Sequence, residues 1–132
     1  MKIMSFNSRG LGGAGKSNYI KELVIKEELD MVCIQETKQE GIMLNLCKSW
    51  WGCNSVECVS TIEQNRADGI LIAWNTLNFN LTKSECGKGF IIIKGKWRDS
   101  SECTTIVNVY SPCETNDKRV LWEELINRKR VD

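Results

Sequence analysis

The hydrophobic pattern of this chain changes after Gly52, and that change limits the folds open to it. Before Gly52, apolar residues recur first as in a strand and then with the spacing of a helix. From residue 53 to residue 110, short apolar stretches follow one another with only turn residues between them. Since no helical period intervenes, these stretches are predicted to be antiparallel neighbours. A helical pattern over residues 115–129 closes the chain, so the sequence predicts the α/β (α+β) class.

The N-terminal part has the pattern of a strand–helix–strand unit. Residues 2–8 are a candidate strand, a helix is predicted from Ser17 or Asn18 to about Leu29, and residues 31–35 form a continuous apolar run. Such a run is typical of a strand buried on both faces. Strands joined by one helix are parallel with a right-handed crossover, so their carboxyl ends should meet at one edge of the sheet.

No linker, repeat or low-complexity stretch interrupts the rest of the sequence, so residues 1–132 are expected to form one domain. Further elements are predicted as a short helix at 42–51 and strands near 53–60, 69–75, 77–83, 89–98 and 102–110.

Composition excludes several kinds of chemistry. The 132 residues contain no histidine, which rules out within this chain a Ser-His-Asp triad, a Cys-His pair, His-ligated zinc and a histidine general base. The net charge of +1 gives no global electrostatic case for nucleic acid. Seven cysteines without a Cys-x-x-Cys pair, and no apolar leader, favour reduced thiols in an intracellular protein of the nucleus or cytoplasm. No apolar run is long enough to span a membrane, so no membrane partner is expected.

The glycine-rich segment from Gly10 to Ser17 matches two nucleotide-binding motifs. The whole segment fits the P-loop pattern, and its first six residues fit the dinucleotide fingerprint G-x-G-x-x-G. Both motifs lie between a strand and a helix, where backbone N–H groups can hold phosphate. However, both nucleotide folds need further strand–helix repeats, and the run of strands after residue 53 does not provide them. A plain strand-to-helix connection is favoured, and a small P-loop or Rossmann-like nucleotide-binding module is the alternative.

Polar side chains stand where the predicted strands end. Asn7 ends the first strand and Glu36 follows the second, and an amide oxygen beside a carboxylate suits Mg²⁺. In the strand at 102–110, Asn108 and Tyr110 share a face, and Tyr110 stands at the strand end. Its phenol could donate a hydrogen bond to a phosphate or a leaving oxygen. Each residue alone has an ordinary structural explanation, and only their combination suggests a site.

Two segments separated by a helix resemble the start of the endonuclease/exonuclease/phosphatase superfamily. They are residues 1–12 (Met-Lys-Ile-Met-Ser-Phe-Asn-Ser-Arg-Gly-Leu-Gly) and residues 30–38 (Asp-Met-Val-Cys-Ile-Gln-Glu-Thr-Lys). Residues 69–74, 107–113 and 117–125 match the same family in order and spacing, so the resemblance covers essentially the whole chain. More narrowly, the chain resembles the apurinic-type endonuclease domain of LINE-type (non-LTR) retrotransposons. The Gln-Glu-Thr-Lys and Asn-x-Tyr-x-Pro signatures are the most specific part of the match.

This resemblance implies a Mg²⁺-dependent phosphodiesterase that nicks DNA, folded as a four-layered α/β sandwich of two facing sheets. By match to the motifs, Asn7 would orient the metal or the phosphate, Glu36 would bind the metal, and Tyr110 would contact the scissile phosphate. These three residues are the catalytic candidates, and Asn7 and Glu36 are the metal-binding candidates. Arg9 and Lys16 would lie near backbone phosphates.

Two motifs of that family, Asp-x-Asn and Ser-Asp-His, do not occur in the 132 residues. They supply the base that activates water and further metal contacts. The chain is therefore interpreted as a truncated N-terminal half of the domain, with one mixed, mostly antiparallel sheet flanked by helices, and as inactive alone. Residues 70–74 are apolar on both faces, and the full fold would cover one face with its second sheet. Without that sheet, we expect an exposed apolar face and self-association through it.

Overall fold

The computed structural model describes residues 1–12, 14–38, 43–61, 69–110 and 115–131. Within these ranges, no helix is both long and apolar enough to cross a membrane. The elements lie close to their predicted positions, and in chain order they are β1 (Ile3–Asn7), α1 (Ala14–Glu27), β2 (Met31–Gln35), α2 (Leu44–Trp51), β3 (Val56–Ser60), β4 (Ile70–Asn75), β5 (Phe79–Gly87), β6 (Phe90–Trp97), β7 (Thr104–Val109) and α3 (Thr115–Val131).

The predicted strand–helix–strand unit is confirmed. Strands β1 and β2 are parallel neighbours, with Asn7 opposite Gln35 at their carboxyl ends. Helix α1 starts at Ala14, earlier than the predicted Ser17 or Asn18. Ser17 therefore lies within the helix, and its hydroxyl oxygen accepts a hydrogen bond from the indole N–H of Trp50 at 2.9 Å. This bond ties α1 to α2.

The strands form two sheets, where the sequence had suggested one mixed sheet. The four-stranded sheet has the order β1-β2-β4-β3, and the three-stranded sheet has the order β5-β6-β7. Strand β4 is antiparallel to β2 on one side and to β3 on the other. With both edges of β4 occupied, β5 cannot pair with it, and the chain crosses to a second layer. Strands β5, β6 and β7 then pair as the predicted antiparallel neighbours.

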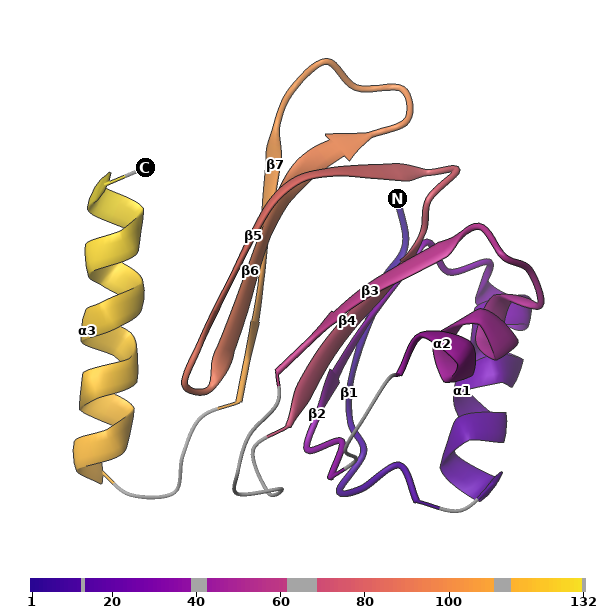
Figure 1. Cartoon of the computed structure of the whole chain (residues 1–132), viewed down its shortest axis with the longest axis horizontal. Coiled ribbons are helices and arrows are strands. Elements are labelled where there is room, and N and C mark those ends of the chain that lie inside the picture. Colours follow the sequence, from indigo (N-terminus) through magenta and orange to yellow (C-terminus); the bar gives the residue numbers. More distant parts are fainter. Residues whose placement is uncertain (13, 39–42, 62–68, 111–114, 132) are drawn as a thin grey trace.

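The elements stack in four layers (Figure 1). Helices α1 and α2 cover one face of the four-stranded sheet, the three-stranded sheet covers its other face, and α3 lies outside the three-stranded sheet. One hydrophobic core joins the helices to the four-stranded sheet and includes Val24, Ile34 and Trp50. A second core fills the space between the sheets and includes Ile72 and Ile93.

The expectation that residues 70–74 would have an exposed face is wrong. Every residue from Ile70 to Trp74 is buried. Leu71 and Ala73 face the helices, whereas Ile70, Ile72 and Trp74 face the other sheet. The cover comes from this chain itself, because β5, β6 and β7 already supply the second sheet.

The described cysteines are free thiols, as predicted: Cys33, Cys47, Cys53, Cys58, Cys86 and Cys103. Burial raises the pKa of Cys33 to about 12, so this thiol stays protonated and packs as an apolar group. The seventh cysteine, Cys113, lies outside the described residues.

Candidate active site

The three candidate side chains meet at one edge of the sandwich. Asn7 ends β1, Glu36 follows the last residue of β2, and Tyr110 follows the last residue of β7. The Asn7 amide nitrogen donates to Glu36 Oε1 at 3.2 Å. Hydrogen bonding by the Tyr110 side chain also lowers the pKa of this carboxyl. Residues from both sheets therefore converge on the Glu36 carboxylate.

The surroundings of Glu36 favour its ionised form. Partial burial works against the charge, but the hydrogen bonds from Asn7 and Tyr110 and the positive charges of Lys38 and Arg9 outweigh it, and the pKa of Glu36 lies below its usual value. The carboxylate is therefore negatively charged at neutral pH, beside two cationic side chains. This arrangement provides a hard anionic ligand next to groups that attract phosphate.

Unusual backbone conformations surround the candidate site. Arg9, Glu36 and Lys38 all adopt left-handed conformations, with φ of 51°, 53° and 49°. Residues other than glycine rarely occupy this region, and doing so costs roughly 1–3 kcal/mol when nothing compensates. Here backbone hydrogen bonds between the segments that follow β1 and β2 stabilise these conformations. The amide of Gly10 donates to the carbonyl of Glu36 at 2.7 Å, and the amide of Leu11 donates to the carbonyl of Thr37 at 2.9 Å.

Ser8 is a positioning residue that the sequence did not indicate. Its side chain is buried, and its hydroxyl donates to the carbonyl of Glu36 at 2.8 Å. The same hydroxyl oxygen accepts from the amide of Gly10 at 3.2 Å. Ser8 thereby locks the loop after β1 to the residue that carries the carboxylate. A serine between Asn7 and Arg9 gives no sequence signal for this role.

A polar network centred on the buried Asn108 joins the two sheets beside the site. The Gln35 amide nitrogen donates to Asn108 Oδ1 at 2.6 Å and to the Ser5 hydroxyl at 3.1 Å. The Asn108 amide nitrogen donates to the carbonyls of Ile34 at 3.1 Å and Leu71 at 2.9 Å. Asn108 lies on the face of β7 that the two-residue alternation had assigned to it with Tyr110. The network fixes the distance between β7 and the four-stranded sheet, and hence the approach of Tyr110 to Glu36.

The glycine-rich loop does not present a nucleotide-binding lysine and serine. The Lys16 ammonium donates to the carbonyl of Ser8, and the Ser17 hydroxyl accepts from Trp50. A P-loop uses these two side chains for phosphate and Mg²⁺. The sheet beside the loop also pairs β2 antiparallel to β4, unlike the parallel sheets of nucleotide-binding folds. The geometry favours the interpretation of this segment as a plain strand-to-helix connection that runs into the first turn of α1.

The chemistry of the donors fits a magnesium ion. Magnesium is typically held by one or two carboxylates and keeps several water molecules. The ionised Glu36 provides the carboxylate, and the Asn7 amide oxygen, which accepts from the Arg9 amide at 3.1 Å, has a second lone pair. Within the described ranges, no cluster of three or more His, Cys, Asp or Glu side chains could hold a metal ion. A magnesium ion would therefore have few ligands among the residues that the structure describes.

Sequence comparison finds no match to a family model or to a curated protein. Solved structures do match. They include a humanised TDP2 from D. rerio, with a TM-score of 0.67 at 13% identity over 96% of this chain and 54% of that one. The endonuclease domain of TRAS1, a telomere-specific non-LTR retrotransposon, gives 0.65 at 13% identity over 96% and 54%. The catalytic domain of APE2 from Xenopus laevis gives 0.58 at 17% identity over 89% and 47%.

These similarities show the fold: the chain has an endonuclease/exonuclease/phosphatase-type α/β sandwich, as its sequence motifs had indicated. The chain spans only about half the length of these structures, 54% of the TDP2 and TRAS1 chains and 47% of the APE2 chain.

Proposed function

We propose that this chain carries one half of a Mg²⁺-dependent DNA endonuclease site of the non-LTR retrotransposon type, and that it does not cut DNA alone. The observation that supports this proposal is that Asn7 and Tyr110 both interact with the carboxylate of Glu36. Asn7 belongs to β1 and Tyr110 follows β7, so the two residues come from different sheets. The nuclease-type fold of the neighbours is the context for it. In this proposal DNA is the partner of the ancestral activity, and the protein is intracellular, in the nucleus or the cytoplasm.

Each side chain has a defined part in this proposal. Glu36, ionised at neutral pH, holds the magnesium ion, and Asn7 keeps the carboxylate oriented through its 3.2 Å hydrogen bond. Bound magnesium would supply Lewis-acid stabilisation of the charge on phosphate oxygens. The Tyr110 hydroxyl can exchange its bond to Glu36 for one to a phosphate oxygen. Arg9 and Lys38 provide the positive potential that attracts a DNA phosphate.

The proposed lack of activity follows from what these residues cannot supply. The 132 residues hold no histidine and neither the Asp-x-Asn nor the Ser-Asp-His motif. Among the described side chains at the site, no second carboxylate stands beside Glu36 to activate water. General-base catalysis contributes roughly 10²–10⁴-fold, and catalytic residues act as a unit, so the loss of one removes most of the rate.

Metal binding can be tested without activity. In a titration of the ¹⁵N-labelled chain with Mn²⁺, amide signals of residues 7, 36 and 110 should broaden before any others. Glu36→Gln should abolish this selective broadening. Glu22→Gln, which changes an exposed carboxylate on α1, should leave it intact. Equal broadening around exposed carboxylates across the surface would contradict a metal site at Glu36.

Catalysis is tested on supercoiled plasmid with Mg²⁺. We expect no nicking above the rate in buffer, for the wild type and for Glu36→Gln alike. Nicking that Glu36→Gln abolishes would leave the site assignment standing and refute the proposed inactivity. Nicking that Glu36→Gln leaves unchanged would refute the site itself.

A further inference from the structure

Gly69 stands at a position where the backbone itself does not call for a glycine. Its φ lies outside the left-handed region, in which Gly10, Gly52 and Gly89 are found. As far as this angle is concerned, other residues could take its place. Gly69 is nevertheless buried, directly before the first residue of β4. The reason for a glycine here is therefore space rather than backbone conformation.

The space above Gly69 is taken by Thr37. A Cβ atom on residue 69 would lie 2.4 Å from Thr37 Oγ1, well inside the 3.4 Å at which ordinary contacts begin. Thr37 is only 4% exposed, and a threonine is branched at Cβ and stiff at χ1, so its hydroxyl cannot turn away into free space. An alanine at position 69 would have to displace Thr37 by about 1 Å to restore an ordinary contact.

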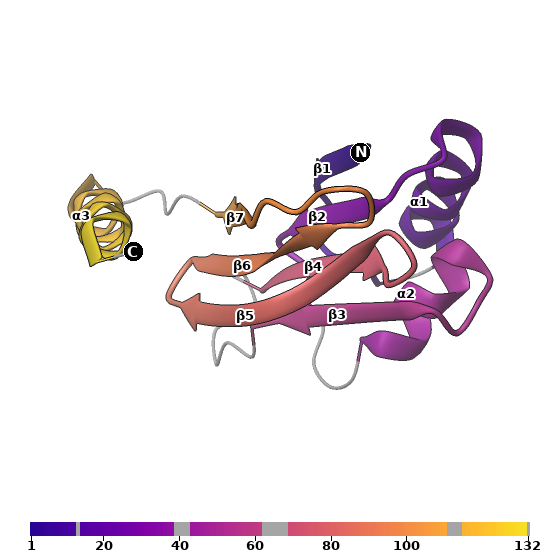
Figure 2. The ribbon, with the colours of Figure 1, turned by 90° about the horizontal axis from the view of Figure 1, so that it is seen from above.

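Backbone hydrogen bonds hold Thr37 on both sides. Strand β2 lies between β1 and β4 in the four-stranded sheet (Figure 2), and the segment after β2 keeps neighbours on both sides. The Thr37 amide donates to the carbonyl of Gly69 at 2.9 Å, and the Thr37 carbonyl accepts from the amide of Leu11 at 2.9 Å. The residues that follow β2 are therefore clamped between the start of β4 and the loop after β1.

Thr37 stands between two charged residues of the candidate site. Glu36 and Lys38 flank it, and their left-handed conformations persist only where the surroundings hold them. The Asn7 amide donates to Glu36 Oε1 at 3.2 Å, which is already at the long end of the usual range for a hydrogen bond. Displacing Thr37 by about 1 Å would carry its neighbour Glu36 with it and lengthen this bond beyond that range.

We propose that Gly69 is a positioning residue for the candidate site: by leaving room for Thr37, it keeps the Glu36 carboxylate within reach of Asn7. This inference rests on the proposed function in that Glu36 is the residue assigned there to the metal. The packing of Thr37 against Gly69 requires no bound metal, so it can be tested separately.

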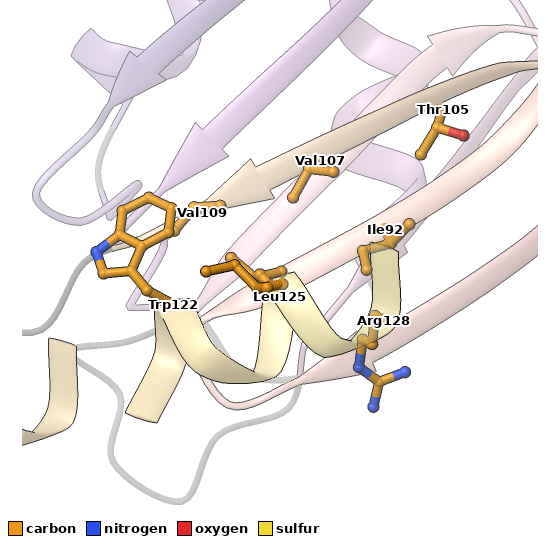
Figure 3. Close-up of a pocket in the computed structure, with 8 residues that line it drawn as sticks. Ile92, Thr105, Val107, Val109, Trp122, Leu125 and Arg128 are labelled. Atoms are coloured by element: carbon orange, nitrogen blue, oxygen red, sulfur yellow. The ribbon is translucent and has the colours of Figure 1, made fainter. Parts of the chain in front are cut away.

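The other sheet provides an internal reference for a local shift. Val109 of β7 and Trp122 of α3 line an apolar groove of about 560 Å³ (Figure 3). This groove belongs to the three-stranded sheet and its covering helix, whereas Gly69 and Thr37 adjoin the ends of β4 and β2. A local shift at Gly69 should therefore leave the indole N–H signal of Trp122 unchanged.

Nuclear magnetic resonance of the ¹⁵N-labelled chain, recorded without metal, tests the proposal through the side-chain amide of Asn7. Glu36→Ala removes the acceptor of its hydrogen bond and so defines the signal of a broken contact. Gly69→Ala should shift the Asn7 side-chain signals in the same direction, because the displaced carboxylate no longer accepts from this amide. The Trp122 indole signal should stay at its wild-type position.

Removing the Thr37 hydroxyl should rescue the substitution. Without Thr37 Oγ1, the atoms nearest to a Cβ at position 69 are the Lys38 amide nitrogen at 3.6 Å and the Cβ of residue 37 at 3.7 Å, both ordinary contacts. Thr37→Ala combined with Gly69→Ala should therefore restore the wild-type signals of Asn7.

Gly95→Ala is the matched control. A Cβ at Gly95 would lie 2.3 Å from the carbonyl oxygen of Asn80, so this variant also strains the fold, but it does so within the three-stranded sheet. It should leave the Asn7 signals unchanged. A shift of these signals equal to that in Gly69→Ala would show general loosening of the fold and overturn the proposal.

Wild-type Asn7 signals in Gly69→Ala would also overturn the proposal, as would a double variant that keeps the shifted signals. Should Gly69→Ala fail to fold, the double variant decides: it should fold with wild-type Asn7 signals, and any other result overturns the proposal. The Mn²⁺ titration separates this inference from the proposed function. A wild type without selective broadening refutes the metal site, while the Asn7 signals still test the role of Gly69.

Discussion

The two helical layers of this sandwich cover their sheets to different extents. Helices α1 and α2 close the outer face of the four-stranded sheet, where Val32, Ile34 and Leu71 are buried and Trp50 is completely enclosed. Helix α3 covers the outer face of the three-stranded sheet, burying Leu121 but leaving Trp122 half-exposed. The same kind of amphipathic helix therefore gives a closed core on one side and a partly open one on the other. Most of the stability should come from the first layer.

The largest expected effect compares one tryptophan from each layer. Trp50→Ala should lower the free energy of unfolding by about 3–5 kcal/mol, because it empties a fully enclosed site and breaks the bond to Ser17. Trp122→Ala should cost less than about 1 kcal/mol. Urea unfolding of the two variants measures both changes in the free energy of unfolding. Similar costs for the two variants would refute the contrast between the layers.

The next effect concerns the polar bridge between the sheets. Asn108→Ala should cost about 2 kcal/mol, because it leaves the Gln35 amide and the carbonyls of Ile34 and Leu71 without their buried partner. Asn80→Ala removes an exposed amide from β5 and should change stability by less than about 0.5 kcal/mol. Thermal melts of the two variants make the comparison, and equal melting temperatures would show that the bridge adds no stability.

A smaller effect is expected where α3 is attached. Arg128 donates to Glu85 at 2.7 Å and to Glu124 at 3.2 Å, and its guanidinium lies 5.2 Å from the centre of the Phe90 ring. Its side chain is 33% exposed, so solvent screens these pairs. Arg128→Gln should cost less than about 1 kcal/mol at low salt and still less at high salt. Arg119→Gln, an exposed change on the same helix, should show neither cost nor salt dependence.

The local elements and the meeting of Asn7 with Glu36 could be predicted from the sequence. Alternation and apolar runs placed the strands, and the strand–helix–strand unit predicted that Asn7 and Glu36 would meet. The same alternation placed Asn108 and Tyr110 on one face of β7. These features depend on residues that are near in sequence or on a topological rule with few exceptions.

The division into two sheets could not be predicted in this way. It depends on β4 having a strand on each edge, which is a long-range pairing that no local pattern encodes. For the same reason the sequence did not show that β5, β6 and β7 bury Ile70, Ile72 and Trp74. The role of Ser8 was also hidden, because it depends on the carbonyl of Glu36, which is distant in sequence.

The central claim is that Asn7 and Tyr110 both interact with the carboxylate of Glu36. An NMR titration of the Glu36 side-chain carboxyl tests this claim most directly. The folded pKa should lie below the usual glutamate value, so the ionised carboxylate stabilises the fold at neutral pH and this contribution is lost as the pH falls through the folded pKa. Tyr110→Phe and Asn7→Ala should each raise that pKa toward the usual value. An ordinary pKa in the wild type, unchanged in both variants, would contradict the account.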